Sequence, residues 1–297
     1  MSRSLAKTGL SHLLSRLLFG PAPVLHHSSR SFQTLAFEEI KSSPEKPHEF
    51  TAFVLHGLLG SGRNWRSFSR SLASRLSPAQ WRMILVDLRN HGRSAEIEGL
   101  LPPHNLENAA KDLADLVKSE DLDWPDVVIG HSMGGKVALQ FAQSCANGHY
   151  GDDVTLPKQA ITFGVVRWLV DHMLKLGFSK SLSEWIGSNL KKSGEQETWA
   201  FNLDGAVQMF NSYREMDYWP LLDHTPKGME IDVVRAEKSD RWNQDVIQQL
   251  EHLSAKGVNE NEGKVLVHVL PNAGHWVHVD NPKGLLDIIA PKVASIV

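Results

Sequence analysis

Beyond the first 33 residues, short apolar runs alternate along the chain with longer segments whose apolar residues recur at helical spacing. The runs have the length of buried strands, and the spacing is that of helices with one apolar face. Strands that alternate with helices predict an α/β protein with a mostly parallel central sheet flanked by helices. The expected strands are Leu35–Ile40, Thr51–Leu55, Met83–Val86, Asp126–Ile129, Ile161–Val166, Ile231–Val234 and Val265–Leu270, and the expected helices are Asn64–Leu76, Asn105–Leu122, Lys136–Ala142, Asn243–Ala255 and Pro282–Val297.

The alternation stops between about residues 167 and 222, where the spacing is helical and large apolar side chains are frequent. We expect a helical lid inserted between two strands, although short helices packed onto the domain would give the same pattern. An aromatic lid favours a substrate with an apolar portion. The large side chains are Trp168, Met173, Leu176, Phe178, Trp185, Trp199, Phe201, Met209, Phe210 and Trp219.

The N-terminal segment differs in composition from the rest of the chain. Its first 37 residues contain no Asp or Glu, and its basic residues lie among many serines and leucines. Organelle transit peptides are Arg- and Ser-rich, amphipathic and poor in acidic residues. We expect residues 1–33 to be a transit peptide for mitochondria, or alternatively chloroplasts, and residues 34–297 to form the folded domain. A disordered basic tail is the competing interpretation. The basic residues are Arg3, Lys7, Arg16 and Arg30.

The pentapeptide Gly130–Gly134, with the sequence Gly-His-Ser-Met-Gly, carries the clearest chemical signal. It follows the apolar strand Asp126–Ile129 and leads into the helix Lys136–Ala142. A serine on such a strand-to-helix turn is held with its hydroxyl exposed, while flanking glycines let strand and helix approach closely. We therefore interpret Ser132 as a nucleophile.

A serine nucleophile needs a base, and the base needs a carboxylate to orient it. His275 directly follows the last expected strand, at the edge where Ser132 would emerge, and is the expected base. Asp240 follows the preceding strand and is the expected acid. Two alternatives stay open: Asp240 could cap the helix that starts near Trp242, and Glu237 could replace it as the acid.

Acyl transfer also requires N–H donors for the tetrahedral oxyanion. The backbone N–H of Met133, directly after the nucleophile, is one candidate. The amide of Leu58, in the loop after the strand Thr51–Leu55, is the other. The Lys-Ser/Thr of a phosphate-binding P-loop is absent from this glycine-containing loop. The expected substrate-pocket residues are His56, Gly57, His131 and Trp276.

Composition narrows the functional classes. The chain has 41% hydrophobic and 22% charged residues and a net charge of -3, which gives no reason to expect a nucleic-acid partner. Its single cysteine, Cys145, cannot form an internal disulfide and indicates a reducing compartment. No metal-ligand spacing or bound cofactor is expected, and no apolar run reaches the roughly 18 residues that span a membrane.

Three segments together resemble an esterase group of the α/β-hydrolase superfamily: His56–Ser61 with Asn64-Trp65, Val86–Ser94 and Gly130–Lys136. The resemblance runs from Leu35 to the C-terminus. It implies the α/β-hydrolase fold and cofactor-free hydrolysis of small-molecule acyl esters or thioesters. It also implies a structural role for the turn Asp87–Ser94. The site residues that it supports are Ser132 as nucleophile, His275 as base, and Leu58 and Met133 as oxyanion donors.

The chain departs from that group after the strand Ile161–Val166. Related proteins carry an Asp followed shortly by Pro there, then a long run into the lid, whereas this strand passes directly into Arg167. The segment is therefore expected to be shortened, and Asp240 has to act as the acid alone. The alternative function is a catalytically impaired protein of the same fold that binds a ligand without turning it over.

The expected activity is that of a serine hydrolase working through an acyl-enzyme. Ser132 would attack the substrate carbonyl, His275 would carry the proton, Asp240 would orient His275, and water would release the acid. Dehalogenases of this fold use an aspartate at the elbow, so Ser132 argues against them. Acyl transfer and haloperoxidase-like activity stay open because the same triad supports both.

Overall fold

The structure, a computed structural model, describes residues 34–297 apart from 44, 164–188, 194–195, 240 and 257–260. The expected transit peptide, the first part of the expected lid and Asp240 lie outside the described residues. Within them, seven strands form one sheet in the order β1-β3-β2-β4-β5-β8-β9. Their bounds are β1 Phe37–Lys41, β2 Phe50–Leu55, β3 Trp81–Val86, β4 Val127–His131, β5 Gln159–Phe163, β8 Glu230–Ala236 and β9 Lys264–Leu270.

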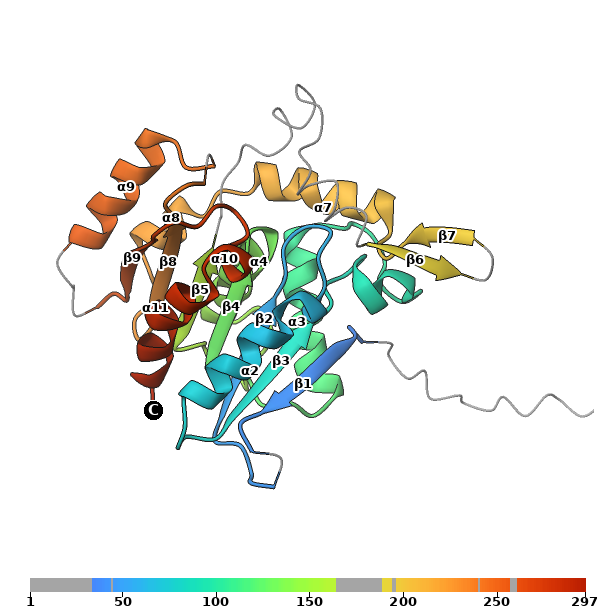
Figure 1. Cartoon of the computed structure of the whole chain (residues 1–297), viewed down its shortest axis with the longest axis horizontal. Helices are drawn as coiled ribbons and strands as arrows, with labels where there is room; N and C mark the ends of the chain where they lie inside the picture. Colours follow the sequence, from blue (N-terminus) through green and yellow to red (C-terminus); the bar gives the residue numbers. More distant parts are fainter. Residues whose placement is uncertain (1–33, 44, 164–188, 194–195, 240, 257–260) are drawn as a thin grey trace, which may run out of the picture. The chain divides into compact units, whose positions relative to one another are not determined.

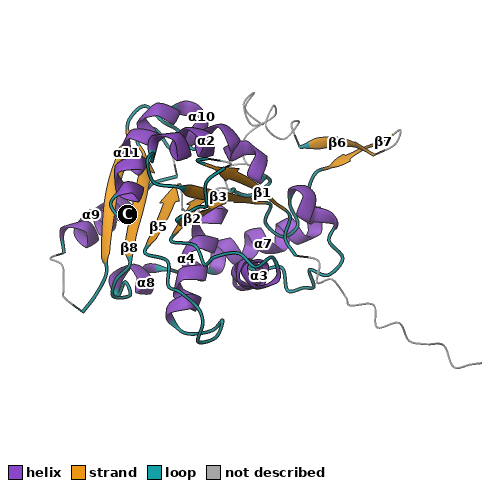
Figure 2. Ribbon diagram, turned by 90° about the horizontal axis from the view of Figure 1, so that it is seen from below, coloured by secondary structure: helices purple, strands orange, loops and turns teal. Residues whose placement is uncertain are grey.

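The sheet is parallel except at one edge, where β1 runs antiparallel to β3. Parallel sheets need cover on both faces, and helices provide it here (Figures 1 and 2). Figure 2 shows α2 and α11 above the sheet and α3, α4 and α8 below it. The helices are α2 Arg66–Arg75, α3 Leu106–Ser119, α4 Met133–Ala146, α7 Leu203–Glu215, α8 Trp219–Asp223, α9 Gln244–Ala255, α10 Val277–Asp280 and α11 Pro282–Ala294.

Two apolar cores fill the space between the sheet and its two helical layers. Leu113 of α3 and Phe141 of α4 belong to the core on one face. Leu72 of α2 and Ile289 of α11 belong to the core on the other. The long helix α3 could be predicted from the sequence because its apolar residues recur on one buried face. Asn105 caps its first turn by accepting the N–H of Asn108.

The sequence pattern predicted each of the seven strands and five covering helices, with ends that differ by a few residues. Residues 164–166, the end of one expected strand, lie outside the described residues. The lid differs in kind, because residues 190–199, expected to be helical, contain the hairpin of β6 Leu190–Ser193 and β7 Gln196–Trp199. The pair Ser193-Gly194 favours a turn, and the spacing of apolar residues alone does not detect it. Helices α7 and α8 follow, as the pattern predicted.

Among the described residues, no helix combines the length and apolar character that a bilayer crossing requires.

Candidate active site

Ser132 occupies a strained turn between β4 and α4. Its backbone φ of 53° and ψ of -115° are rare for a residue with a side chain, and such strain is concentrated at functional sites. The N–H of Ser132 donates to the carbonyl of Phe163 on β5 at 2.6 Å, which fixes the turn to the neighbouring strand. Ser132 is therefore held rigidly at the carboxyl edge of the sheet, directly before the first N–H groups of a helix.

Close backbone packing explains the glycines on either side of this serine. A Cβ on Gly130 would lie 2.3 Å from the carbonyl oxygen of Gly134. A Cβ on Gly134 would lie 2.4 Å from the carbonyl oxygen of His56. Both distances are shorter than real side-chain contacts, so the elbow can form only with glycine at the two positions.

The loop after β2 lies directly against the elbow. A Cβ on Gly57 would lie 2.8 Å from Nδ1 of His131 and 3.2 Å from Cβ of Ser132. The loop turns back on itself through the N–H of Gly60, which donates to the carbonyl of Gly57, and through Leu59, whose φ is 57°. The expected donor Leu58 thus belongs to the segment that touches Ser132. Met133 is the first residue of α4, where N–H groups have no intrahelical partner.

Buried polar contacts hold this loop from below. Nδ1 of His56 lies 2.7 Å from the carbonyl oxygen of Gly57, and Nε2 of His56 accepts the N–H of Leu88 at 2.9 Å. Because the second contact requires an unprotonated Nε2, the first is a donation from Nδ1–H. Burial lowers the pKa of His56 and outweighs the opposing effect of Asp87, which keeps the ring neutral and this tautomer in place.

The turn Asp87–Ser94 has the contacts of a structural element. Asp87 accepts the N–H groups of Gly62 and Arg93, and Ser94 Oγ donates to the carbonyl of Asp87. Arg89 is buried and binds both carboxylate oxygens of Asp112 on α3, at 2.6 and 2.9 Å. Desolvation nevertheless raises the pKa of Asp112, so the ion pair only partly offsets the cost of burying its charge.

His275 lies in the loop between β9 and α10, against the elbow residue His131. Nε2 of His131 lies 3.0 Å from the carbonyl oxygen of His275, and the two ring centroids are 4.8 Å apart. Burial, the ring of His131 and the guanidinium of Arg241 hold the pKa of His275 well below 6.5. A neutral imidazole is the form that can accept a proton. The buried Nδ1 of His275 has no hydrogen-bond partner among the described residues.

The expected acid, Asp240, lies outside the described residues, but the segments on either side of it are described. The N–H groups of Glu237 and Lys238 donate to the carbonyls of Leu270 and Ala273, at the end of β9 and in the loop after it that contains His275. The carboxylate of Glu237 is exposed and accepts the N–H of Asn272 at 2.8 Å. These contacts hold Glu237 and Lys238, which precede Asp240 in the chain, beside the loop that carries His275.

One alternative for Asp240 is removed by the start of α9. This helix begins at Gln244, and Asn243 is its N-cap, accepting the N–H of Val246 at 2.8 Å. The capping role that the sequence left open for Asp240 therefore belongs to Asn243.

A cavity of about 300 Å³ opens beside the loop that follows β2; we call it the His131 cavity. The four expected pocket residues, His56, Gly57, His131 and Trp276, all line it. Burial lowers the pKa of His131 to about 3, so a neutral ring faces this space.

Trp65 and His278 are among the lining residues of this cavity that were not predicted from the sequence. Their ring centroids are 4.3 Å apart, and Trp65 also lies 5.7 Å from the ring of His131. Burial lowers the pKa of His278 to about 4. Trp65 precedes α2 and His278 lies in α10, so the contact depends on tertiary structure. The available signal was the pair Asn64-Trp65, which contributed to the family resemblance.

The sequence of this chain is similar to those of known proteins. Residues 52–288 match the family described as "Alpha/beta hydrolase family". The chain is 25% identical over 264 residues to the Mus musculus protein named sn-1-specific diacylglycerol lipase ABHD11, covering 81% of this chain and 80% of that protein. It is also 25% identical over 270 residues to esterase YbfF of Escherichia coli (strain K12), covering 82% and 94%.

Among solved structures, an esterase from a marine microorganism has a similar fold. Its TM-score is 0.62 with 20% sequence identity, and the alignment covers 89% of this chain and 99% of that one.

Proposed function

Because this chain belongs to the alpha/beta hydrolase family, as its resemblance predicted, we propose that it is a serine hydrolase of carboxylic esters or thioesters. The observation that carries the proposal is the strained φ of Ser132, directly before α4 and against the loop that contains Leu58. Strained backbone at a serine is retained where it positions the hydroxyl for chemistry. The relatives named as a lipase and an esterase support the same reaction class.

The proposed reaction has two halves. Ser132 Oγ attacks the carbonyl carbon while His275 takes its proton, and the oxyanion is bound by the amides of Leu58 and Met133. His275 then gives the proton to the leaving alcohol or thiol, which departs. In the second half, water attacks the acyl-enzyme with His275 again as base, and the carboxylic acid is released. Asp240 orients His275 in this scheme, a role supported by the backbone hydrogen bonds that join the preceding residues Glu237 and Lys238 to Leu270 and Ala273.

A fluorescent fluorophosphonate tests the proposal, because it reacts with a serine that an adjacent base activates. The folded chain should be labelled, and Ser132→Ala and His275→Ala should both abolish labelling. Ser144→Ala is the matched control: this serine is buried on the same helix, about three turns from the elbow, and its loss should leave labelling unchanged. If the folded chain is not labelled, the alternative of a ligand-binding protein without turnover is favoured.

We also propose that residues 1–33 direct the protein to mitochondria. The support is compositional: this segment lacks acidic residues and is rich in Arg and Ser. Fusion of the segment to a fluorescent protein should give mitochondrial fluorescence, and replacing its four basic residues by Gln should abolish it. A diffuse or plastid signal from the unaltered fusion would contradict the proposal.

A further inference from the structure

One side chain of the elbow, that of His131, is not required by the elbow itself. The close approach of strand and helix demands glycine at positions 130 and 134, whereas the pattern Gly-x-Ser-x-Gly leaves the residue before the serine open. His131 is the last residue of β4, and only 2% of it is exposed. A buried imidazole costs free energy unless its polar atoms are satisfied, so the partners of this ring indicate its role.

The ring of His131 donates to the main chain of the proposed base. A carbonyl oxygen can only accept, so the 3.0 Å contact between Nε2 of His131 and the carbonyl of His275 is a donation from Nε2–H. Within the described part of the chain, no other hydrogen bond involves His275, whose Nδ1 is buried without a partner. The polar contact that holds His275 therefore comes from the residue directly before Ser132.

The two imidazoles also pack against each other. Their ring centroids are 4.8 Å apart, with the ring planes inclined by 46°. The ring of Trp276 lies 5.8 Å from that of His131 and 5.2 Å from that of His275. One contact thus holds the backbone of His275, and the other restricts the rotation of its ring. A base must present one ring nitrogen to the nucleophile, so both restrictions affect proton transfer.

The hydrogen bond joins two distant parts of the sheet. β5 and β8 lie between β4, which ends at His131, and β9, which leads to His275. The ends of β4 and β9 are therefore separated by three strand spacings of about 4.8 Å each. The loop after β9 has to cross this distance to place His275 at the elbow, and the N–H of His131 holds it there.

The same ring lies against the loop after β2. A Cβ on Gly57 would lie 2.8 Å from Nδ1 of His131, so the loop can approach the ring this closely only with glycine at that position. Trp65, which precedes α2, lies 5.7 Å from the ring. Two loops, one with the proposed donor Leu58 and one with the proposed base, therefore contact the side chain of the residue before the proposed nucleophile.

From these contacts, and resting on the proposed function, we propose that His131 is a positioning residue: its Nε2–H holds the carbonyl of His275 and thereby sets the place of the base relative to Ser132. His131 does not take the serine proton itself, because its Nε2 carries the donated hydrogen and its Nδ1 lies against Gly57. The site requires a donor at this place and not a second titrating imidazole.

Two substitutions separate the donor from the ring. His131→Phe keeps a ring and removes the donor, whereas His131→Gln removes the ring and keeps an N–H donor near the place of Nε2. With p-nitrophenyl acetate, kcat of His131→Phe should fall by about 10- to 100-fold, since misplacing a reacting group by about an ångström costs up to about a hundredfold. KM should change by less than about twofold, and His131→Gln should recover kcat to within about fivefold of the unaltered chain.

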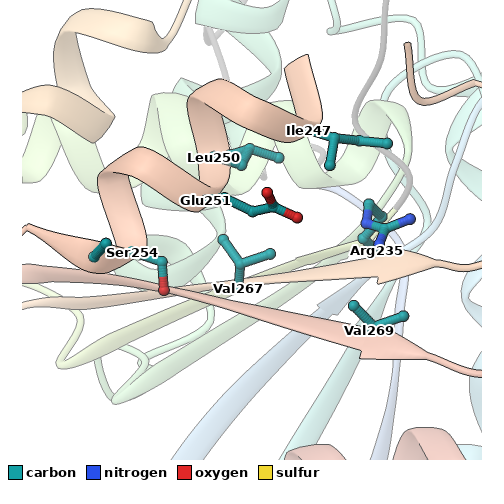
Figure 3. Close-up of a pocket in the computed structure, with 8 residues that line it drawn as sticks. Arg235, Ile247, Leu250, Glu251, Ser254, Val267 and Val269 are labelled. Atoms are coloured by element: carbon teal, nitrogen blue, oxygen red, sulfur yellow. The ribbon is translucent and has the colours of Figure 1, made fainter. Parts of the chain in front are cut away.

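Ile247→Ala is the control for a general loss of packing. Ile247 belongs to α9 and lines a cavity of about 350 Å³ between this helix and the strands β8 and β9, together with Arg235 and Val267 (Figure 3). As far as the structure describes it, the lining of this cavity includes no residue of the elbow. The variant should lose stability in urea denaturation and keep kcat within about twofold. If circular dichroism shows that His131→Phe does not fold, His131→Leu, which also lacks the donor, takes its place.

Amide hydrogen exchange of residues 271–276, followed by mass spectrometry, tests the contact without catalysis. Exchange should be faster in His131→Phe, and close to that of the unaltered chain in His131→Gln and Ile247→Ala. This pattern supports the hold on His275 even if the chain hydrolyses no ester, in which case the proposed function fails alone. In an active chain, an unchanged kcat in His131→Phe, or a kcat in His131→Gln no higher than in His131→Phe, overturns the inference and leaves the hydrolase intact. Equal exchange in all four chains also overturns it.

Discussion

At the scale of single residues, the candidate site depends on Ser132 and on the few atoms that surround it. The turn is closed by the bond from its N–H to Phe163, and the approach of Gly57 leaves no room for another side chain. The proposed base, His275, follows a different strand, and burial together with the rings and the guanidinium around it lowers its pKa. Two substitutions test these statements separately.

Gly57→Ala should reduce kcat/KM by at least about tenfold, since displacement of reacting groups by about an ångström costs up to about a hundredfold. The added methyl would lie 2.8 Å from Nδ1 of His131, so the loop that contains the proposed donor Leu58 would have to move. Gly148→Ala is the control. It has a φ of +69° and open space around it, so Ala there costs roughly 1–2 kcal/mol of stability without touching the site. Equal kcat/KM for Gly57→Ala and the unaltered chain would contradict the placement of this loop.

Asp240→Asn should lower kcat by about a thousandfold or more if Asp240 orients the base. It should also move the acidic limb of the kcat/KM profile to lower pH. A carboxylate stabilises the imidazolium and raises its pKa, so its removal leaves burial, His131 and Arg241 to lower the pKa of His275 further. Glu237→Gln removes a neighbouring exposed carboxylate and should leave both quantities unchanged. Loss of activity in Glu237→Gln instead would identify Glu237 as the acid.

At the scale of elements, α4 connects the nucleophile to the helices that cover it. Lys136 reaches from α4 to two carbonyls at the C-terminal end of α7, where a cation is favoured by the helix dipole. Tyr218 adds a second link, donating its hydroxyl to Oε1 of Gln140 at 2.9 Å. The end of α7 and the turn into α8 are thus fixed to α4, the helix that begins directly after Ser132.

Lys136→Met should lower the free energy of unfolding by about 2–3 kcal/mol, because charge-assisted hydrogen bonds to buried carbonyls are lost. Urea denaturation followed by circular dichroism measures the change. Lys111→Met on α3 is the control, since Lys111 is exposed and only pairs with Asp115 one turn away. Its effect should stay below about 0.5 kcal/mol. Similar losses in the two variants would rule out the anchoring role of Lys136.

At the same scale, the strands of the sheet could be predicted because buried strands are rich in apolar residues. Every residue of β4 and β5 is buried, and both contain a short apolar stretch, Val127–Ile129 in β4 and Ala160 with Ile161 in β5. The hairpin of β6 and β7 has no such run and was expected to be helical. Likewise, Ser132 and His275 could be proposed as site residues because each follows the end of a strand. The contact between Lys136 and the end of α7 could not be predicted, because the two segments are far apart in the sequence and no local pattern relates them.

At the scale of the whole molecule, several buried histidines lie near the carboxyl ends of the strands, and their lowered pKa keeps them neutral. Burial is the leading cause in each case, and it lowers the pKa of His91 to about 3. His56 and His131 are shifted in the same direction, as is His278. In the unfolded chain these groups would titrate near 6.5, so acid favours the unfolded state.

The free energy of unfolding should therefore fall as the pH drops from about 7 to about 4. In this window the unfolded chain binds protons that the folded chain does not, which costs up to about 1.4 kcal/mol per pH unit for each histidine. Urea denaturation at several pH values measures the slope. His91→Asn should reduce that slope by up to about one proton, whatever its effect on stability at neutral pH. An unchanged slope would show that His91 is protonated in the folded state.

The glycine contacts at the elbow have a consequence for how this protein could acquire new substrates. Gly130, Gly134 and Gly57 bring main chain against main chain or against the residues of the elbow itself, with no side chain between that could be exchanged. Substitutions at these three glycines therefore cannot change the substrate preference of the proposed catalytic centre without disrupting it. Adaptation stays open at positions such as Val246 and Val279, which line cavities without being fully buried. Libraries for directed evolution are best confined to such cavity-lining positions, where substitutions can change substrate selectivity with the least disturbance of the proposed catalytic residues.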